Sequence, residues 1–374
     1  MIRVEEVKDR AGLKQFIHFP AGLYQSDPSW VPPLSIERLH FFSKKNPYFE
    51  HARWQCWLAY QGSALVGRIS AQIDELHLSR YDSRTGFFGS LEAENSPEVF
   101  HALFEAAEAW LRGEGMTTVQ GPFNLSINQE CGLLIDGFDD PPMVMMGHAR
   151  PYYSHQVEAN GYQRAQDMLA YRLEINFPLP SGVARFLGKA KESVQIRPLR
   201  RKQLKEELAI IKEIYEEAWA ENWGFLPITD AELAELGQQM KLLLEDDFVQ
   251  IAEVDGVPCA MLVAFPNLHE VIHDLQGRLW PLGWLKILWR LKVAHPKTGR
   301  VLLMGVRRRF QSSPMGAVMA YGMIEAVRQA GLRKGIEQVE LSWILEDNKR
   351  MRHVLESLGA EPYKTYRVYE KSLN

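Results

Sequence analysis

Residues 301–331 read VLLMGVRRRFQSSPMGAVMAYGMIEAVRQAG, an apolar run followed by a short polar stretch and a long, mainly apolar segment. The run Val301–Val306 predicts a strand. Pro314 suits the first turn of a helix, which we expect to end at Gly331. The turn Gln311–Gly316 then joins strand to helix. Such a turn directs free backbone N–H groups and the positive end of the helix dipole at one point, where a pyrophosphate can bind.

The same order of elements occurs twice along the chain, which indicates a weak internal repeat. The first copy has a hairpin, a strand, a helix, a strand, a helix and a last strand, at residues 57–71, 87–92, 97–111, 117–119, 152–160 and 168–173. The second copy has the same elements at residues 249–265, 301–306, 314–330, 338–344, 348–358 and 365–369. Strands that alternate with helices favour an α/β fold with a mixed sheet.

Length and composition predict two ordered domains. A chain of 374 residues is longer than an ordinary single-core domain. Its 46% of apolar and 24% of charged residues are typical of soluble globular proteins. Pro178, Pro180, Ser181 and Gly182 cluster within residues 176–193 and indicate a linker. We therefore expect the two domains to be residues 1–178 and 192–374.

Charge and cysteine content exclude several functional classes. The net charge of −4 argues against a nucleic-acid-binding protein, which needs a strongly basic surface. Cys56, Cys131 and Cys259 lie far apart, without a CxxC pair, so no disulfide framework or zinc site is indicated. The charged N-terminus lacks the apolar run of a signal peptide, and no uncharged run is long enough to span a membrane. We expect a cytoplasmic protein without a metal.

The run from Val306 to Gly316 resembles the coenzyme A motif of GNAT acyltransferases, whose pattern is Gln/Arg-x-x-Gly-x-Gly/Ala. Gln311 takes the first place and Gly316 the last, while Pro314 replaces the usual middle glycine and removes one phosphate donor. Val306 and Phe310 also match the apolar and aromatic places before the loop. Asn348 precedes Gly359 by the family's spacing of eleven residues.

The resemblance implies two tandem GNAT-like domains, each with a mixed sheet flanked by helices. No glycine-rich loop follows the strand at residues 87–92, because Ala93-Glu94-Asn95 leads directly into the helix. The first domain thus resembles a degenerate GNAT domain with a structural or acceptor-binding role. The chain is similar to a bacterial family of two-GNAT-domain proteins and, in part, to N-acyltransferases that act on long-chain amines.

The resemblance also implies acetyl-CoA or a longer acyl-CoA as co-substrate and no metal. The thioester would lie where the fourth and fifth strands of the second domain diverge, and a primary amine, small or lipid-like, would attack it directly in a ternary complex. A backbone N–H near Met304 to Val306 would hold the thioester carbonyl. The implied coenzyme A-binding residues are Met304, Val306, Gln311, Ser312, Ser313, Met315, Gly316 and Asn348.

The residues that transfer protons are less clearly marked. The family often has a tyrosine acid four residues before its glycine, but this chain has Leu355 there. Tyr363, Tyr366 and Tyr369 lie nearby in the sequence, and Tyr366 is taken as the alternative acid. Glu253, Glu340 and Glu346 are candidate bases. The competing interpretation is aromatic packing on a strand for the tyrosine and surface exposure for the carboxylates.

Two aromatic segments are candidates for substrate binding. Asn222 and Trp223 follow a helix that, by resemblance, borders the acceptor site. Residues 278–293 combine three tryptophans with only basic charges, so Trp284 and Trp289 are candidates to cover a long acyl chain. Alternatives are a helix on the inner membrane surface and a helix packed on the partner domain. The sequence predicts an acyltransferase, and the alternative is a non-catalytic acyl-CoA- or lipid-binding protein.

Overall fold

A computed structural model describes residues 1–179, 193–243 and 245–374. Most of the expected linker, including Pro180, Ser181 and Gly182, lies outside the described residues. By their contacts the residues form two compact units. Unit 1 contains Met1–Met168, Ile272–Gly283 and Lys364–Asn374, and unit 2 contains Leu169–Val271 and Trp284–Tyr363.

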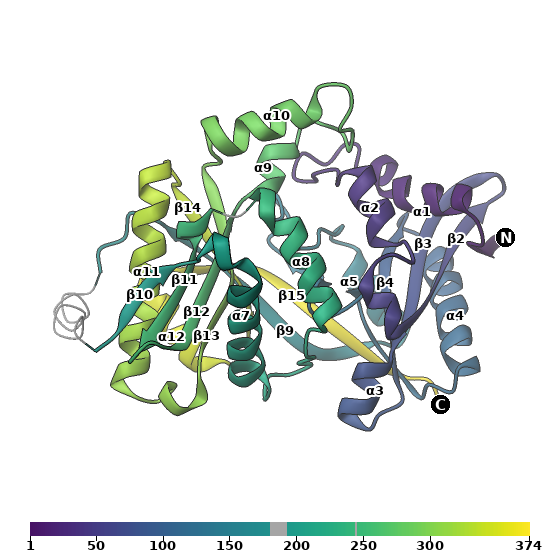
Figure 1. Cartoon of the computed structure of the whole chain (residues 1–374). Coiled ribbons are helices and arrows are strands. Elements are labelled where there is room, and N and C mark those ends of the chain that lie inside the picture. Colours follow the sequence, from purple (N-terminus) through teal and green to yellow (C-terminus); the bar gives the residue numbers. More distant parts are fainter. Residues whose placement is uncertain (180–192, 244) are drawn as a thin grey trace. The chain divides into compact units, whose positions relative to one another are not determined.

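Unit 1 has a mixed sheet in the order β1-β2-β3-β4-β5-β15 (Figure 1). Its neighbouring strands are antiparallel except for the parallel pair β4 and β5. The elements up to the middle of β9 are β1 Ile2–Glu6, α1 Arg10–Leu23, α2 Ser35–Phe41, η1 Pro47–Glu50, β2 Ala52–Gln61, β3 Ala64–Asp74, α3 Glu75–Tyr81, β4 Thr85–Ala93, α4 Pro97–Gly113, β5 Thr118–Gly121, β6 Phe123–Asn124, β7 Glu130–Cys131, β8 Leu133–Asp136, α5 Tyr153–Ala159 and β9 Gln163–Glu174.

Helices cover both faces of this sheet, because side chains alternate between the faces of a strand. On β2, Cys56 and Leu58 belong to one core cluster with Phe16 of α1. Trp57 points to the other face, where its ring lies 6.2 Å from that of Trp110 on α4. The hairpin predicted at residues 57–71 is therefore confirmed, and it carries a core on each side.

Unit 2 has the strand order β14-β13-β12-β11-β10, and β9 flanks β14. Only β13 and β14 pair in parallel among β10 to β14. The elements from β10 onward are β10 Gln195–Pro198, η2 Arg201–Gln203, α7 Leu204–Trp219, α8 Asp230–Leu243, η3 Asp246–Phe248, β11 Val249–Val254, β12 Val257–Pro266, α9 Leu268–Ile272, α10 Gly283–Trp289, η4 Arg290–Ala294, β13 Thr298–Val306, η5 Arg308–Phe310, α11 Pro314–Lys334, β14 Gln338–Leu345, α12 Lys349–Ser357 and β15 Glu361–Ser372.

Strand β12 shows how this sheet is sandwiched between helices. Met261 and Val263 pack in one cluster with Ile214 of α7. Leu262 points to the opposite face and packs in another cluster with Met319 of α11. The predicted α/β class with a mixed sheet is confirmed. Helix α11 continues past the predicted end at Gly331 and is capped by Gly335, whose φ is +75°.

The last strands of the two repeat copies are exchanged between the units. Strand β15, the last strand of the second copy, pairs with β5 of unit 1 from Gly121↔Tyr369 to Thr118↔Ser372. Strand β9, the last strand of the first copy, lies next to β14 in unit 2. There Ile175 N–H donates to Glu337 O at 2.8 Å.

Deleting residues 364–374 should abolish the cooperative unfolding of unit 1. The deletion leaves β5 unpaired on one side and removes Tyr366, Val368 and Tyr369, which have no exposed surface. Losing several such side chains costs more than the roughly 5–15 kcal/mol that stabilises a domain. Thermal unfolding and limited proteolysis measure the effect.

Deleting residues 1–6 is the matched control, because β1 is a mostly exposed edge strand. This shorter deletion should lower the stability of unit 1 much less than the deletion of residues 364–374 does. Equal protease protection of unit 1 in the 364–374 deletion and in the full chain would show that β15 is dispensable.

Candidate functional site

Strands β13 and β14 separate part of the way along their length. Their parallel pairing runs from Thr298↔Gln338 to Val301↔Leu341, although β13 continues to Val306. On its other side β13 stays paired with β12 as far as Val306↔Ala260. The second half of β13 therefore has one side that β14 does not pair.

The turn between β13 and α11 is closed by its own hydrogen bonds. Ser313 caps the helix, because its Oγ accepts from Gly316 N–H at 3.1 Å and donates to Phe310 O at 2.8 Å. A Cβ on Gly316 would lie 2.1 Å from Phe310 O, so only glycine fits. Gln311 donates to Val306 O at 3.0 Å and thereby fastens the turn to the end of β13.

The turn presents donors at the start of α11. Among the described residues, the N–H groups of Ser312 and Met315 have no hydrogen-bond acceptor. Arg350 of α12 adds a cation, since its Nη1 donates to Ser312 Oγ at 3.0 Å. Asn348 caps α12 by accepting from Met351 N–H at 3.1 Å. The structure thus brings the predicted turn, the start of α12 and a guanidinium together, an arrangement suited to a phosphate.

Two of the three arginines before the turn are held by α7. Arg307 forms ion pairs with Glu217 at 2.7 Å and Glu213 at 3.0 Å. Arg308 Nε donates to Glu217 O at 3.0 Å, and Arg308 also pairs with Glu221, just beyond α7, at 2.9 Å. These contacts fix the end of β13 to α7. Arg309 instead lies over the Phe310 ring, 4.8 Å from its centroid.

The end of α7 reaches the unpaired part of β13. The Trp219 indole N–H donates to Met304 O at 3.4 Å. Asn222 then forms a turn, in which its N–H donates to Trp219 O and its carbonyl accepts from Phe225 N–H. Asn222 and Trp223, both half-buried, follow this contact directly. Trp284 and Trp289 are exposed on α10.

Of the three predicted catalytic residues, Glu253 and Glu346 belong to unit 2 and Tyr366 belongs to unit 1. Glu253 is buried on β11, which is separated from β13 by β12. It pairs with Arg197 at 2.7 Å. Glu346 directly follows β14, and its carbonyl accepts from Arg352 at 3.0 Å. Tyr366 is fully buried in unit 1, opposite Leu134. Their catalytic roles stay predictions.

A buried polar cluster lies where β13 and β14 separate. Arg300 and Glu340 face each other in register, with their charged groups 3.6 Å apart and almost no exposure. Ser342 donates to Glu340 at 2.5 Å, and Tyr363 donates to the same carboxylate. The sequence pointed to Glu340 and to Tyr363 separately, but not to Arg300 or Ser342. An arginine within the apolar strand at 298–306 was the available signal, because such a charge needs a buried anion.

The corresponding opening in unit 1 is filled by the chain itself. Strands β4 and β5 pair only from Thr85↔Thr118 to Phe87↔Gln120. Beyond that point β6 lies against β4, because Asn124 Oδ1 accepts from Ser90 N–H at 2.7 Å. A Cβ on Gly89 would lie 1.9 Å from Phe123 O. Strand β6 therefore covers this part of β4.

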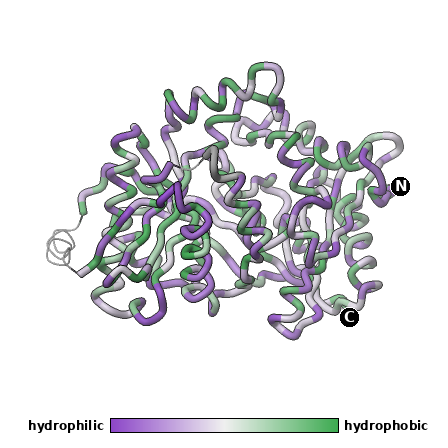
Figure 2. Tube along the Cα trace, viewed as in Figure 1, coloured by the Kyte–Doolittle hydropathy of each residue, from purple (hydrophilic) through white to green (hydrophobic). Residues whose placement is uncertain are grey.

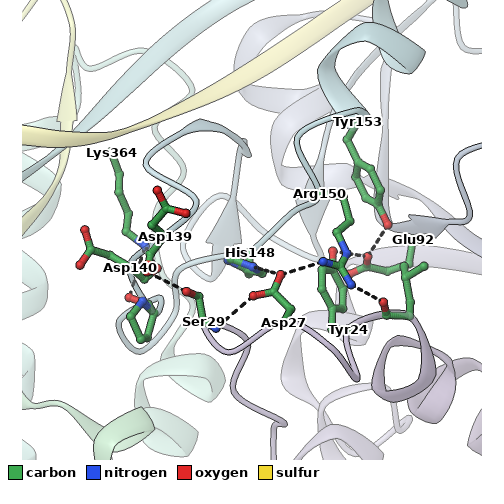
Figure 3. Close-up of polar contacts among 12 residues, drawn as sticks. Tyr24, Asp27, Ser29, Glu92, Asp139, Asp140, His148, Arg150, Tyr153 and Lys364 are labelled. Carbon is green, nitrogen blue, oxygen red and sulfur yellow. Dashed lines mark hydrogen bonds and ion pairs between the residues drawn. The ribbon is translucent and has the colours of Figure 1, made fainter.

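Unit 1 instead contains a largely buried carboxylate, Glu92, whose side chain is 13% exposed, at the end of β4 (Figure 3). Tyr24 and Tyr153 each donate to its Oε2 at 2.7 Å. Arg68 lies 3.9 Å from its Oε1. Burial raises the pKa of Glu92, and Arg68 opposes this effect. A carboxylate with a raised pKa beside two hydroxyls is a group that can exchange protons.

Asp27 holds a second set of polar groups in the same unit (Figure 3). It accepts from Ser29 N–H at 3.0 Å, His148 Nε2 at 3.0 Å and Arg150 Nη1 at 3.1 Å. Because a carboxylate only accepts, His148 carries its proton on Nε2. Burial lowers the pKa of His148, so the ring is neutral, and its buried Nδ1 has no partner among the described residues. Nearby, Lys364 donates to Asp140 O at 2.6 Å.

Sequence reasoning missed this unit 1 cluster because its residues come from four separate segments. They are Tyr24, Asp27, Ser29, Arg68, Glu92, His148, Arg150 and Tyr153. None of these segments matches a motif by itself. Among the described residues, no group of three or more histidines, cysteines or carboxylates is arranged to hold a metal ion.

No family model matches the chain. Among solved structures, a tandem GNAT protein from the clavulanic acid biosynthesis pathway has a TM-score of 0.57 at 13% identity, over 100% of this chain and 99% of that one. A GCN5-related N-acetyltransferase from Sphaerobacter thermophilus has a TM-score of 0.55 at 12% identity, over 100% and 96%. The fold is therefore a tandem GNAT fold, and the resemblance seen in the sequence is confirmed.

Two curated proteins match nearly the whole chain. Protein YghO of Escherichia coli (strain K12) is 48% identical over 362 residues, which are 96% of this chain and 93% of that protein. The bacterial ceramide synthase of Caulobacter vibrioides (strain NA1000 / CB15N) is 45% identical over 375 residues, covering 100% and 98%. The chain belongs to the family of these two proteins.

Replacing Glu92 by glutamine should lower the free energy of unfolding by about 3 kcal/mol, because Arg68 loses the carboxylate beside it in a buried place. The double variant Arg68→Met/Glu92→Gln should lose less than the sum of the two single variants. Denaturant unfolding measures all three. The control is Glu94→Gln, an exposed neighbour that should change little; strictly additive effects would mean that the two charges do not interact.

Proposed function

We propose that this protein is an acyltransferase that moves an acyl group from acyl-CoA to the primary amine of a long-chain, lipid-like acceptor. The observation that carries the proposal is the 45% identity, over the whole chain, with a protein named bacterial ceramide synthase. A ceramide is the amide of a fatty acid and a long-chain amino alcohol. Acyl transfer to an amine is therefore the reaction class that the relative's name supports.

Unit 2 is the proposed donor site. The separation of β13 from β14 supports it, because a pantetheine chain can pair with the open side of β13 as a strand would. The pyrophosphate would then lie at Ser312, Ser313, Met315 and Gly316, with Arg350 and Asn348 beside the turn. The backbone around Met304 to Val306 would hold the thioester carbonyl. Acetyl-CoA and longer acyl-CoA both fit this description of the donor.

The reaction needs no covalent enzyme intermediate. The amine nitrogen attacks the thioester carbon, the carbon–sulfur bond breaks, and the new amide bond forms. A base takes one proton from the amine, and the leaving thiolate receives one, so the protons balance. Backbone N–H groups would stabilise the oxyanion of the tetrahedral intermediate.

For the proton transfers we rank the candidates by their surroundings. Glu346 lies between the end of β14 and the start of α12, whose Arg350 donates to Ser312 of the donor turn, and this supports Glu346 as the base. Glu253 is already paired with Arg197, which weighs against it as the base. Leu355 packs in the core and, as a hydrocarbon side chain, cannot donate the proton that the family's tyrosine donates. Tyr366 stays a candidate acid from unit 1. The Glu340–Tyr363 pair lies where the two strands separate, and this contact favours Tyr363 as a candidate acid.

The acceptor would approach from the end of α7. Trp219 already touches β13 through Met304 O, and Asn222 and Trp223 follow it. A half-buried tryptophan and an amide suit an acceptor with an apolar chain and a polar head. For the first domain, residues 1–178, the filled opening beside β4 supports a structural or acceptor-binding role rather than a second donor site.

Gly316→Ala should weaken the binding of coenzyme A by at least about tenfold, equal to about 1.4 kcal/mol. The added Cβ would collide with Phe310 O and displace the turn. Isothermal calorimetry with CoA and with acetyl-, octanoyl- and palmitoyl-CoA measures the change.

The matched control is Gly113→Ala, also at a helix end, where an added Cβ meets nothing within 4 Å. Its affinity should equal that of the unchanged protein. If Gly316→Ala bound coenzyme A as tightly as the unchanged protein does, the turn would not be part of the donor site. If the unchanged protein bound none of the acyl-CoA compounds, acyl-CoA would not be the donor.

Tyr363→Phe should lower kcat by about ten- to a hundredfold and leave the affinity for acyl-CoA unchanged. The substitution keeps the ion pair of Glu340 with Arg300 and removes only the hydroxyl. Release of free thiol with a panel of long-chain amino alcohols gives the rate. An unchanged kcat would exclude Tyr363 as the acid.

A non-catalytic acyl-CoA- or lipid-binding protein is the second candidate. It is favoured by two departures from the family pattern, Pro314 in the turn and the buried Leu355. The thiol assay separates the two. Tight binding of acyl-CoA without thiol release by any amine would favour the binding protein.

A further inference from the structure

The segment from α10 through η4, residues 284–293, exposes an apolar surface. Trp284 is 40%, Leu288 is 41% and Leu285 is 45% exposed, and Trp289 and Val293 reach 58% and 63%. Trp280 and Leu282, just before it in the chain, are 76% and 61% exposed. Seven of the twelve exposed large hydrophobic side chains of the described residues thus fall within 14 consecutive positions.

The other side of the same segment is already packed. Leu291 is 6% exposed, and Ile287, four residues earlier, is half-buried. The segment is therefore apolar both where it packs and where it meets solvent. A helix that is apolar all round is normally buried, so the exposed side requires a partner.

The charges of this region indicate what the partner is. The chain has no acidic residue between Asp274 and Glu325, whereas Arg278, Lys286, Arg290 and Lys292 are basic. Lys292 pairs with Glu245 at 3.1 Å, and Lys286 is exposed. Figure 2 shows hydrophobic and hydrophilic residues interleaved along α10. Tryptophan and leucine with interspersed lysine and arginine match an anionic bilayer surface in both polarity and charge.

The length of the segment sets the depth of insertion. Residues 283–294 form less than about 20 Å of helix, against a hydrocarbon core of about 30 Å. No helix of the described residues is both long and apolar enough to cross a membrane. The segment can therefore only lie in the plane of the interface, with the tryptophan rings at the level of the headgroups.

We propose that residues 284–293 are a docking surface for an anionic lipid bilayer. Trp284, Leu285, Leu288 and Trp289 insert below the headgroups, and Lys286 contacts lipid phosphates. This inference goes beyond the proposed acyl transfer and does not depend on it. A bilayer is nevertheless where an acceptor with a long alkyl chain is found.

The test is co-sedimentation of the full chain with vesicles of phosphatidylglycerol and phosphatidylcholine, without acyl-CoA. The unchanged protein should bind, and Trp284→Ser/Trp289→Ser should lower the binding constant by at least about tenfold. Lys286→Glu should lower it by at least about fivefold and weaken its dependence on salt. Pure phosphatidylcholine vesicles should bind less of every variant.

The control is Val257→Ser/Leu332→Ser, which removes two exposed apolar side chains elsewhere in unit 2 and should bind like the unchanged protein. Brominated lipid should quench tryptophan emission in the control but less in the tryptophan variant. Circular dichroism confirms that each variant is folded.

Three results would overturn the proposal. One is equal vesicle binding by the tryptophan variant and the control. Another is that the unchanged protein does not bind vesicles but forms a dimer, measured by light scattering, which the tryptophan substitutions dissociate. A second copy of the chain would then be the partner. The last comes from separate calorimetry: if the tryptophan variant keeps its vesicle binding and loses only its affinity for palmitoyl-CoA, the surface belongs to the acyl chain. Because the vesicle assay itself contains no acyl-CoA or amine, its outcome is independent of whether the protein catalyses acyl transfer.

Discussion

The hydrogen bonds of the β13 backbone are the constraint on which unit 2 depends. A strand inside a sheet needs partners on both sides, but β13 loses β14 after Val301 while keeping β12 to Val306. Side chains around this opening hold the strand ends in place. Arg307 ties the strand end to α7, Gln311 closes the turn, and the Arg300–Glu340 pair fills the point of separation. The opening is thus a built feature, with donors at one end and buried charges at the other.

Unit 1 meets the same constraint in the opposite way. Its β4 and β5 separate as early as β13 and β14 do, but Phe123 and Asn124 return to occupy the opening, and Gly89 admits their backbone. The polar groups of unit 1 are then gathered at the end of β4, around Glu92. The same arrangement of strands is therefore left open in unit 2 and closed by β6 in unit 1. This difference supports different roles for the two units.

The sequence predicted the features that are determined locally. Both hairpins and the start of α11 at Pro314 depend on neighbouring residues, and the structure has them where they were expected. The prediction that this helix ends at Gly331 was wrong. That glycine lets the helix pack closely on Ile175 and does not form a left-handed cap. The partners of Glu92 could not be predicted, since they meet only through the fold. The exposed side of α10 could not be distinguished from a packed one, because burial depends on what lies opposite.

Nothing in the alternation of β9 or β15 indicates which sheet each of them joins, so their exchange was also beyond the sequence. It has a consequence for the order in which the protein is made. Residues 1–168 emerge from the ribosome long before β15, and until then the edge of β5 has no partner strand. Such an edge can pair with other chains. During synthesis the first half must therefore wait in an incomplete state, or be protected by a chaperone, until its last strand arrives.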